Sequence, residues 1–148
     1  MKATFLRDGR IEEWTVHLRD AIDETVVALF TGGHCAALAL ALHDRTGYPL
    51  VAVAPASETP DPHNGGICHV AVQPPDAGPH EIVDILGRRV IGETEWADYD
   101  RQLMWTQADL TPITREAVEA LQDLFAAELR LPTAVAAHYA RLVVRTRT

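Results

Sequence analysis

A cysteine that follows a pair of glycines is the first place where this sequence could do chemistry. Gly32 and Gly33 can adopt backbone conformations that other residues avoid, and an alanine- and leucine-rich helix is predicted to begin directly after them. The N-terminus of a helix carries a partial positive charge and free N–H groups, which favour a thiolate and can hold a developing oxyanion. Cys35, at that N-terminus, is therefore a candidate nucleophile. The competing interpretation is a small buried cysteine on a core helix.

A histidine and a carboxylate lie on two later segments that are predicted to be neighbouring strands. Residues 67–73 and 81–86 are apolar runs joined by a turn-like segment, which predicts an antiparallel hairpin. We expect its register to place His69 opposite Asp84, with their Cβ atoms about 4.5–5.5 Å apart on one face. Asp84 would then accept a hydrogen bond from one imidazole nitrogen, and the other would face a nucleophile. Taken alone, His69 also fits a core histidine and Asp84 a strand end or turn cap.

The order and placement of Cys35, His69 and Asp84 resemble those of papain-like thiol hydrolases, in particular the bacterial toxin-type and transglutaminase-like members of that superfamily. Three short stretches carry the resemblance, namely residues 33–39 (Gly-His-Cys-Ala-Ala-Leu-Ala), 69–72 (His-Val-Ala-Val) and 83–87 (Val-Asp-Ile-Leu-Gly). The resemblance implies an α+β papain-like fold, with the cysteine helix packed on a small antiparallel sheet and additional C-terminal helices. It also implies a catalytic triad, in a hydrolase, deamidase or acyltransferase that attacks an amide or thioester of a protein or peptide-like substrate without a cofactor.

One position departs from the pattern of such families, which often have a glutamine or asparagine shortly before the cysteine as an oxyanion donor. This sequence has a leucine, a phenylalanine and Thr31 there instead. Backbone N–H groups near Cys35 or the Thr31 hydroxyl would then hold the oxyanion. We expect Thr31, Gly33 and His34 to line the substrate side of the cysteine. The departure also favours the alternative function, a catalytically inactive binding or immunity-type protein on the same scaffold.

The segment of residues 55–66, which joins two predicted strands, is a second candidate for substrate contact. It contains three prolines, two glycines and two acidic residues, and few apolar ones. Loops of this length are often lids or specificity elements. We expect His63 and Asn64 to contact substrate beside the Cys35 cleft; the alternative is a solvated excursion without a role.

A zinc site is a competing use of the same kinds of side chain. The candidate ligands are His34, Cys35, His63, Cys68, His69 and Asp84. Adjacent residues of a strand point to opposite faces, however, so Cys68 and His69 would point away from each other. The sequence contains no Cys-x-x-Cys or His-x-x-x-His spacing. We therefore expect no metal at the site.

Composition limits the expected partners and location. The 148 residues carry a formal net charge of −8, whereas nucleic-acid binding needs a basic surface, so we expect no nucleic-acid partner. No apolar run has the length of a membrane span, and no signal peptide is recognisable. The two cysteines are expected to be free thiols. These features predict a cytoplasmic protein without a membrane partner, or an effector delivered without a classical signal peptide.

The remaining elements must position these side chains. The pattern predicts a strand at residues 1–6, helical structure over 11–30 with Asp20 as a candidate cap, the cysteine helix from His34 to about Arg45, and a buried strand at 50–54. Further helical structure is predicted at 94–103, at Asp109 or Thr111, from Thr114 as cap of the main helix, and from Pro132. We predict a single papain-like domain over residues 1–148, with its core at about 11–90 and a C-terminal helical extension at about 93–146.

Overall fold

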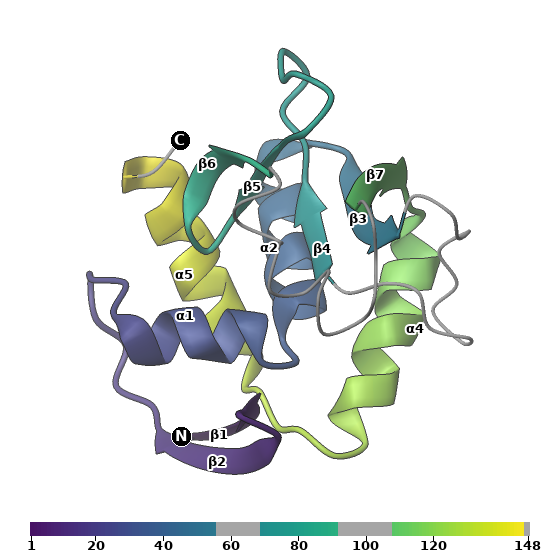
Figure 1. Ribbon diagram of the computed structural model, residues 1–148. Helices are drawn as coiled ribbons and strands as arrows, with labels where there is room; N and C mark the ends of the chain where they lie inside the picture. The colour runs from purple at the N-terminus through teal and green to yellow at the C-terminus, as the bar shows by residue number, and fades with distance from the viewer. Residues whose placement is uncertain (56–68, 92–107, 147–148) are drawn as a thin grey trace.

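The computed structural model describes residues 1–55, 69–91 and 108–146 and shows an α+β fold. Its elements are β1 (Lys2–Arg7), β2 (Arg10–Thr15), α1 (Glu24–Thr31), α2 (Cys35–Thr46), β3 (Leu50–Pro55), β4 (His69–Val72), β5 (Glu81–Asp84), β6 (Gly87–Val90), β7 (Ala108–Pro112), α4 (Arg115–Ala126) and α5 (Thr133–Thr146) (Figure 1). Strands β1 and β2 form a hairpin of their own. The other described strands form an antiparallel sheet in the order β6-β5-β4-β3-β7.

Helix α2 lies at the centre of the molecule, behind the five-stranded sheet, and contacts β4, α4 and α5 (Figure 1). A helix that is apolar on nearly all sides is expected to be buried. Its buried residues are Ala36, Ala37, Leu38, Ala39, Leu40 and Leu42. The helix ends, as predicted, at Gly47, which adopts the left-handed conformation (φ 74°) and donates its N–H to the His43 carbonyl at 2.8 Å.

Both faces of the five-stranded sheet are apolar. Val70, Val72 and Val83 belong to the main hydrophobic cluster, which also includes α2 and extends along the chain from Ala3 to Val143. The opposite face carries a second cluster, formed by Val51, Val53, Ala71, Ile82 and Ile91. Burial on both faces explains why the central strands β3 and β4 are mostly apolar in the sequence, without a polar alternation.

The N-terminal region contains the first correction, because residues 10–15 form a strand and not the start of a helix. Strand β2 pairs with β1 through a turn at Asp8 and Gly9, both of which have positive φ (52° and 74°). This is the conformation that favours Asp-Gly in tight hairpins, so the turn and the pairing override the four-residue apolar spacing. Helix α1 is capped by Asp23, not by Asp20; the Asp23 side chain accepts a hydrogen bond from the Val26 N–H at 3.0 Å.

The C-terminal half contains the second correction. Residues 108–112, where a helix start was predicted, form β7 and pair with β3, while α4 begins after Thr114, which caps it as predicted. Strand β6 was also missed. Since β7 extends the sheet and α4 and α5 pack on α2, the C-terminal segment is part of the same core and is not an appended helical extension. The helix predicted at 94–103 lies outside the described residues.

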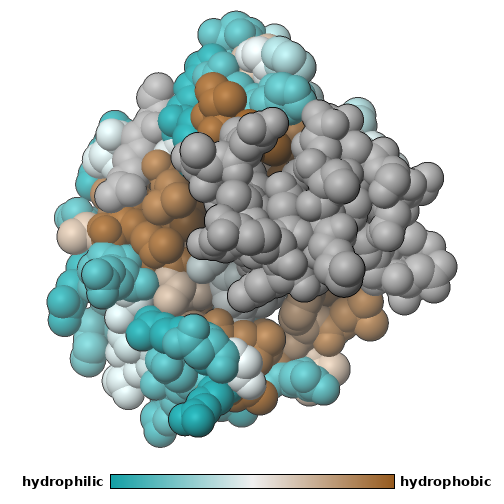
Figure 2. All heavy atoms as spheres, in the orientation of Figure 1, coloured by the Kyte–Doolittle hydropathy of each residue, from teal (hydrophilic) through white to brown (hydrophobic). Residues whose placement is uncertain are grey.

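On the face seen in Figure 2, hydrophilic side chains dominate at the top and at the lower left, with hydrophobic areas between them. The large exposed hydrophobic residues include Leu6 and Ile11 on the N-terminal hairpin and Leu86 and Val90 near β6. Within the described ranges, no single helix is long and apolar enough to cross a membrane; α1 and α2 have the combined length and composition, but they are bent by 96° where they meet.

Candidate active site

The bend between α1 and α2 places Cys35 at the start of the buried helix, and two glycines make the bend sterically possible. A Cβ at Gly32 would lie 2.2 Å from the Leu6 carbonyl oxygen, and Gly33 has φ +113°. A Cβ at Gly33 would lie 2.4 Å from Leu129 Cδ1. The direction in which a side chain would point at residue 33 is thus filled by the core. Gly33 shapes the turn, and the place of a side chain at residue 33 is taken by Leu129, so only its backbone is available to substrate.

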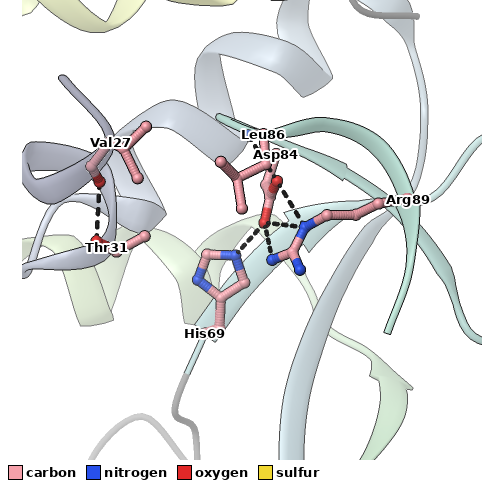
Figure 3. Close-up of polar contacts among 6 residues, drawn as sticks. All are labelled: Val27, Thr31, His69, Asp84, Leu86 and Arg89. Atoms are coloured by element: carbon pink, nitrogen blue, oxygen red, sulfur yellow. Dashed lines mark hydrogen bonds and ion pairs between the residues drawn. The ribbon is translucent and has the colours of Figure 1, made fainter. Parts of the chain in front are cut away.

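Cys35, His69 and Asp84 lie together at one site. Cys35 is a half-buried free thiol, and the His69 side chain lies close enough to act on its pKa. His69 Nε2 donates to Asp84 Oδ2 at 2.9 Å, which leaves Nδ1 as the ring nitrogen for the sulfur (Figure 3). His69 and Asp84 are only 5% and 2% exposed. The two side chains therefore hold each other in one orientation with little access of water.

The strand register that brings His69 to Asp84 differs from the predicted one. Val72 lies opposite Val83, and extending this register puts Asp84 opposite Ala71. His69 and Asp84 are therefore diagonal neighbours and not directly opposed. A register shifted by two residues keeps every side chain on its face, because the side-chain period of a strand is two. The two residues meet despite the error, since long side chains reach their diagonal neighbours.

Electrostatics at this site favour charged forms of all three groups. Burial lowers the pKa of His69, but hydrogen bonds and charges from Asp84 and Cys35 outweigh it and raise this pKa to about 9. Burial raises the pKa of Cys35, but the His69 interaction and the backbone N–H groups of Val70 and Ala36 bring it below its ordinary value. Burial likewise raises the pKa of Asp84, but its bonds to His69 and Arg89 hold it well below its usual range. The arrangement can thus hold a thiolate beside an imidazolium.

Arg89 is a site residue that the sequence reasoning missed. Its Nη2 donates to Asp84 Oδ2 at 2.7 Å, and its Nε donates to Oδ1 at 3.1 Å (Figure 3). The residue lies on β6, which was not predicted. A signal was present, because an aspartate followed three residues later by glycine, as in Asp84 and Gly87, is typical of a type I turn and could have indicated another strand.

Two residues predicted to bind substrate have other roles. The Thr31 hydroxyl donates to the Val27 carbonyl at 2.8 Å, within its own helix (Figure 3). The hydroxyl is therefore engaged within its own helix, and its role as oxyanion donor stays a prediction. His34 is 5% exposed, and its Nε2 donates to the Thr4 carbonyl at 2.6 Å. His34 thus joins the start of α2 to β1, and its Nε2 is engaged in that bond; its contact with substrate stays a prediction.

The other predicted contacts, His63 and Asn64, lie outside the described residues, as does Cys68. The part of the chain that the structure describes contains no group of three or more His, Cys, Asp or Glu side chains placed to hold a metal ion. His63 and Cys68, two of the six zinc-ligand candidates, are not covered by that statement.

A cavity of about 480 Å³ lies between α2, α4 and α5. Ala37, Ala41 and Asp44 of α2 are among the residues that line it. By the helical period of 3.6 residues, these positions are on the side of α2 opposite Cys35. This cavity is therefore not the space in front of the thiol.

Comparison of the chain with protein families, with curated proteins and with solved structures gives no match. Function must therefore be inferred from the site itself.

Proposed function

We propose that this protein is a papain-like, cysteine-dependent hydrolase, deamidase or acyltransferase that acts on an amide or thioester of a protein or peptide-like substrate. The observation that carries the proposal is the buried His69–Asp84 hydrogen bond next to Cys35, which begins a helix and interacts with the imidazole. The α+β fold supports it, because the cysteine helix packs against an antiparallel sheet that supplies the histidine and the acid.

In the first step of the proposed reaction, the Cys35 thiolate attacks the carbonyl carbon and forms a tetrahedral intermediate. The imidazolium of His69 then gives its proton to the departing amine, ammonia or thiol, and the C–N or C–S bond of the substrate breaks. Asp84 stays ionised and stabilises the imidazolium by accepting from Nε2. The product of this step is a thioester between the substrate acyl group and Cys35.

In the second step, neutral His69 accepts a proton from the attacking group. Water gives hydrolysis or deamidation, whereas an acceptor amine or hydroxyl gives acyl transfer. The attack forms a second tetrahedral intermediate, from which Cys35 leaves as a thiolate while His69 is again an imidazolium. The starting state is thus restored, and protons balance over the cycle.

Backbone groups are the candidates for stabilising the oxyanion. The N–H groups of Ala36 and Val70 already interact with the sulfur, and the former belongs to the first turn of α2. Donors at a helix N-terminus favour developing negative charge. They would replace the side-chain amide that the sequence lacks before Cys35.

The direct test is alkylation of the two cysteines by iodoacetamide at neutral pH. Cys35 should react much faster than Cys68, because its thiolate is stabilised by His69 and the helix N-terminus. Cys68→Ser is the matched control and should leave the fast reaction intact, whereas Cys35→Ser should abolish it. Equal or reversed reactivity of the two thiols would remove the basis of the proposal.

A screen with electrophilic acyl probes and zinc analysis of the same sample separate the remaining alternatives. Selective acylation of Cys35 without zinc supports the enzyme. Stoichiometric zinc with protected thiols would indicate a metal site, and an unreactive, metal-free Cys35 would indicate the binding or immunity-type protein.

A further inference from the structure

We propose that Arg89 is a positioning residue, whose guanidinium fixes the Asp84 carboxylate in the orientation that His69 requires. This inference rests on the proposed function, because it assigns Arg89 a role in the same site. Arg89 and His69 approach Asp84 from different sides and from different strands (Figure 3). The contacts described for Arg89 are with the Asp84 carboxylate, and the proposed role is exerted through that carboxylate.

The carboxylate of Asp84 is held by donors on both oxygens. Oδ2 accepts from His69 Nε2 at 2.9 Å and from Arg89 Nη2 at 2.7 Å. Oδ1 accepts from the Leu86 N–H at 2.9 Å and from Arg89 Nε at 3.1 Å. A carboxylate offers about four lone-pair sites, and these contacts fill them. Rotation of the Asp84 carboxylate would break several of these hydrogen bonds at once. The contacts therefore fix the plane of the carboxylate in the orientation that accepts from His69 Nε2.

The tight turn between β5 and β6 positions both groups that hold Asp84 besides His69, namely the Leu86 N–H and the Arg89 guanidinium. Asp84 pairs with Gly87, so the chain turns back directly after the aspartate, and the Leu86 N–H in the turn reaches Oδ1. Arg89 follows on β6 opposite Ile82, on the sheet face that also carries His69 and Ala71. One short hairpin therefore supplies the carboxylate, its backbone donor and its guanidinium.

Of the two adjacent arginines, Arg89 contacts Asp84, and Arg88 has other partners. Side chains alternate along a strand, and Arg88 pairs at the surface with Glu81 and Asp76. Its side chain is 31% exposed, against 16% for Arg89. Arg89, on the sheet face of Asp84, therefore holds the buried carboxylate, and Arg88, on the opposite face beside Val83, offers a matched control.

Two effects of Arg89 on His69 have opposite signs and can be told apart. In the described residues, the charged or titratable groups that face His69 are Cys35 from α2 and Asp84 from β5, and Arg89 from β6 faces Asp84. If Arg89 contributed only positive charge, its removal would raise the pKa of His69. If Arg89 positions Asp84, its removal lets the carboxylate turn away, and the pKa of His69 falls.

The experiment is an NMR titration of His69 in a Cys35→Ala background, where the imidazole titrates without the thiol. Arg89→Met should lower the pKa of His69 by about one unit or more, and Arg88→Met should leave it unchanged. In an Asp84→Asn background, Arg89→Met should cause no further shift, because the residue acts through Asp84. An unchanged or raised pKa in Arg89→Met would overturn the inference.

Arg89→Lys covers the case in which Arg89→Met does not fold. Lysine keeps the charge but not the two-pronged geometry, so positioning predicts a fall in the same direction, and an unchanged pKa contradicts it. With the thiol present, alkylation of Cys35 at pH 6 should slow about tenfold in Arg89→Met. The titration needs neither thiol nor turnover, so failure of this inference and failure of the proposed enzyme function give different results.

Discussion

Two buried histidines lie near Cys35, one beside it in the sequence and the other beside it in space. His34 and His69 are both 5% exposed. His34 donates to the Thr4 carbonyl, and burial lowers its pKa despite that hydrogen bond. His69 is hydrogen-bonded to Asp84 and interacts with Cys35, and its pKa rises to about 9. The two imidazoles are thus equally exposed to solvent, but the site favours the neutral form of His34 and the charged form of His69.

The comparison teaches that the partner, and not the degree of burial, separates a structural histidine from a candidate catalytic one. A carbonyl oxygen carries only a partial charge and cannot offset the cost of burying an imidazolium. A carboxylate and a thiolate together can offset this cost, because each carries a full negative charge. His34 is therefore suited to connect two elements, and His69 is suited to hold and return a proton.

The largest expected effect comes from removing the histidine that touches Cys35 in space. In His69→Asn, the thiol loses the imidazolium, and its pKa should return to about 8.5 or higher. Iodoacetamide labelling of Cys35 at pH 6 should then slow about 100-fold, and turnover of any acyl substrate should fall about 10²–10⁴-fold.

His34→Asn is the control for that measurement. Since His34 bonds to β1 and not to the thiol, labelling of Cys35 should stay within about threefold of the unmodified protein. A comparable loss in both variants would mean that the two histidines do not differ in the way described.

An intermediate effect is expected on the pH profile when the carboxylate partner is removed. Turnover or acyl-probe reaction should fall above about pH 9, where His69 loses the proton it must donate. In Asp84→Asn, this alkaline limit should move down toward pH ~6.5, because the imidazolium loses its counter-charge. Asp76→Asn removes an exposed carboxylate that pairs with Arg88 and should leave the limit in place.

The smallest expected effect concerns stability at His34. His34→Asn should lower the free energy of unfolding by about 1–3 kcal/mol at pH 8, because the Thr4 carbonyl loses its donor. The pKa of His34 is lowered on folding, so the stability it contributes is present above about pH 6.5 and is lost as the pH falls. Denaturant unfolding should therefore show a smaller difference between the two proteins at pH 5 than at pH 8; an equal or larger one would contradict the assignment.

The α+β class and the contact between His69 and Asp84 followed from the sequence, whereas the register and several elements around them did not. The cysteine helix was predictable because glycine, alanine and leucine act through local backbone preferences. The contact between His69 and Asp84 was found with the wrong register, since an error of two residues preserves the face of a strand. The sequence predicts helix where strand β2 lies, because its apolar residues recur at a spacing close to the helical period. Only the pairing with β1 shows that the segment is a strand.

What the sequence by itself determined is the local chemistry, namely a thiol at a helix start, an imidazole on one strand and a carboxylate on the next strand. What only the tertiary structure decided is which polar groups meet. The roles of His34, Thr31 and Arg89 depend on Thr4, Val27 and Asp84, respectively. Two of these contacts join different elements, and a hydrogen bond acts over about 3 Å while residues near in sequence can point apart. Partner identity therefore follows from packing and strand order, which no local pattern encodes.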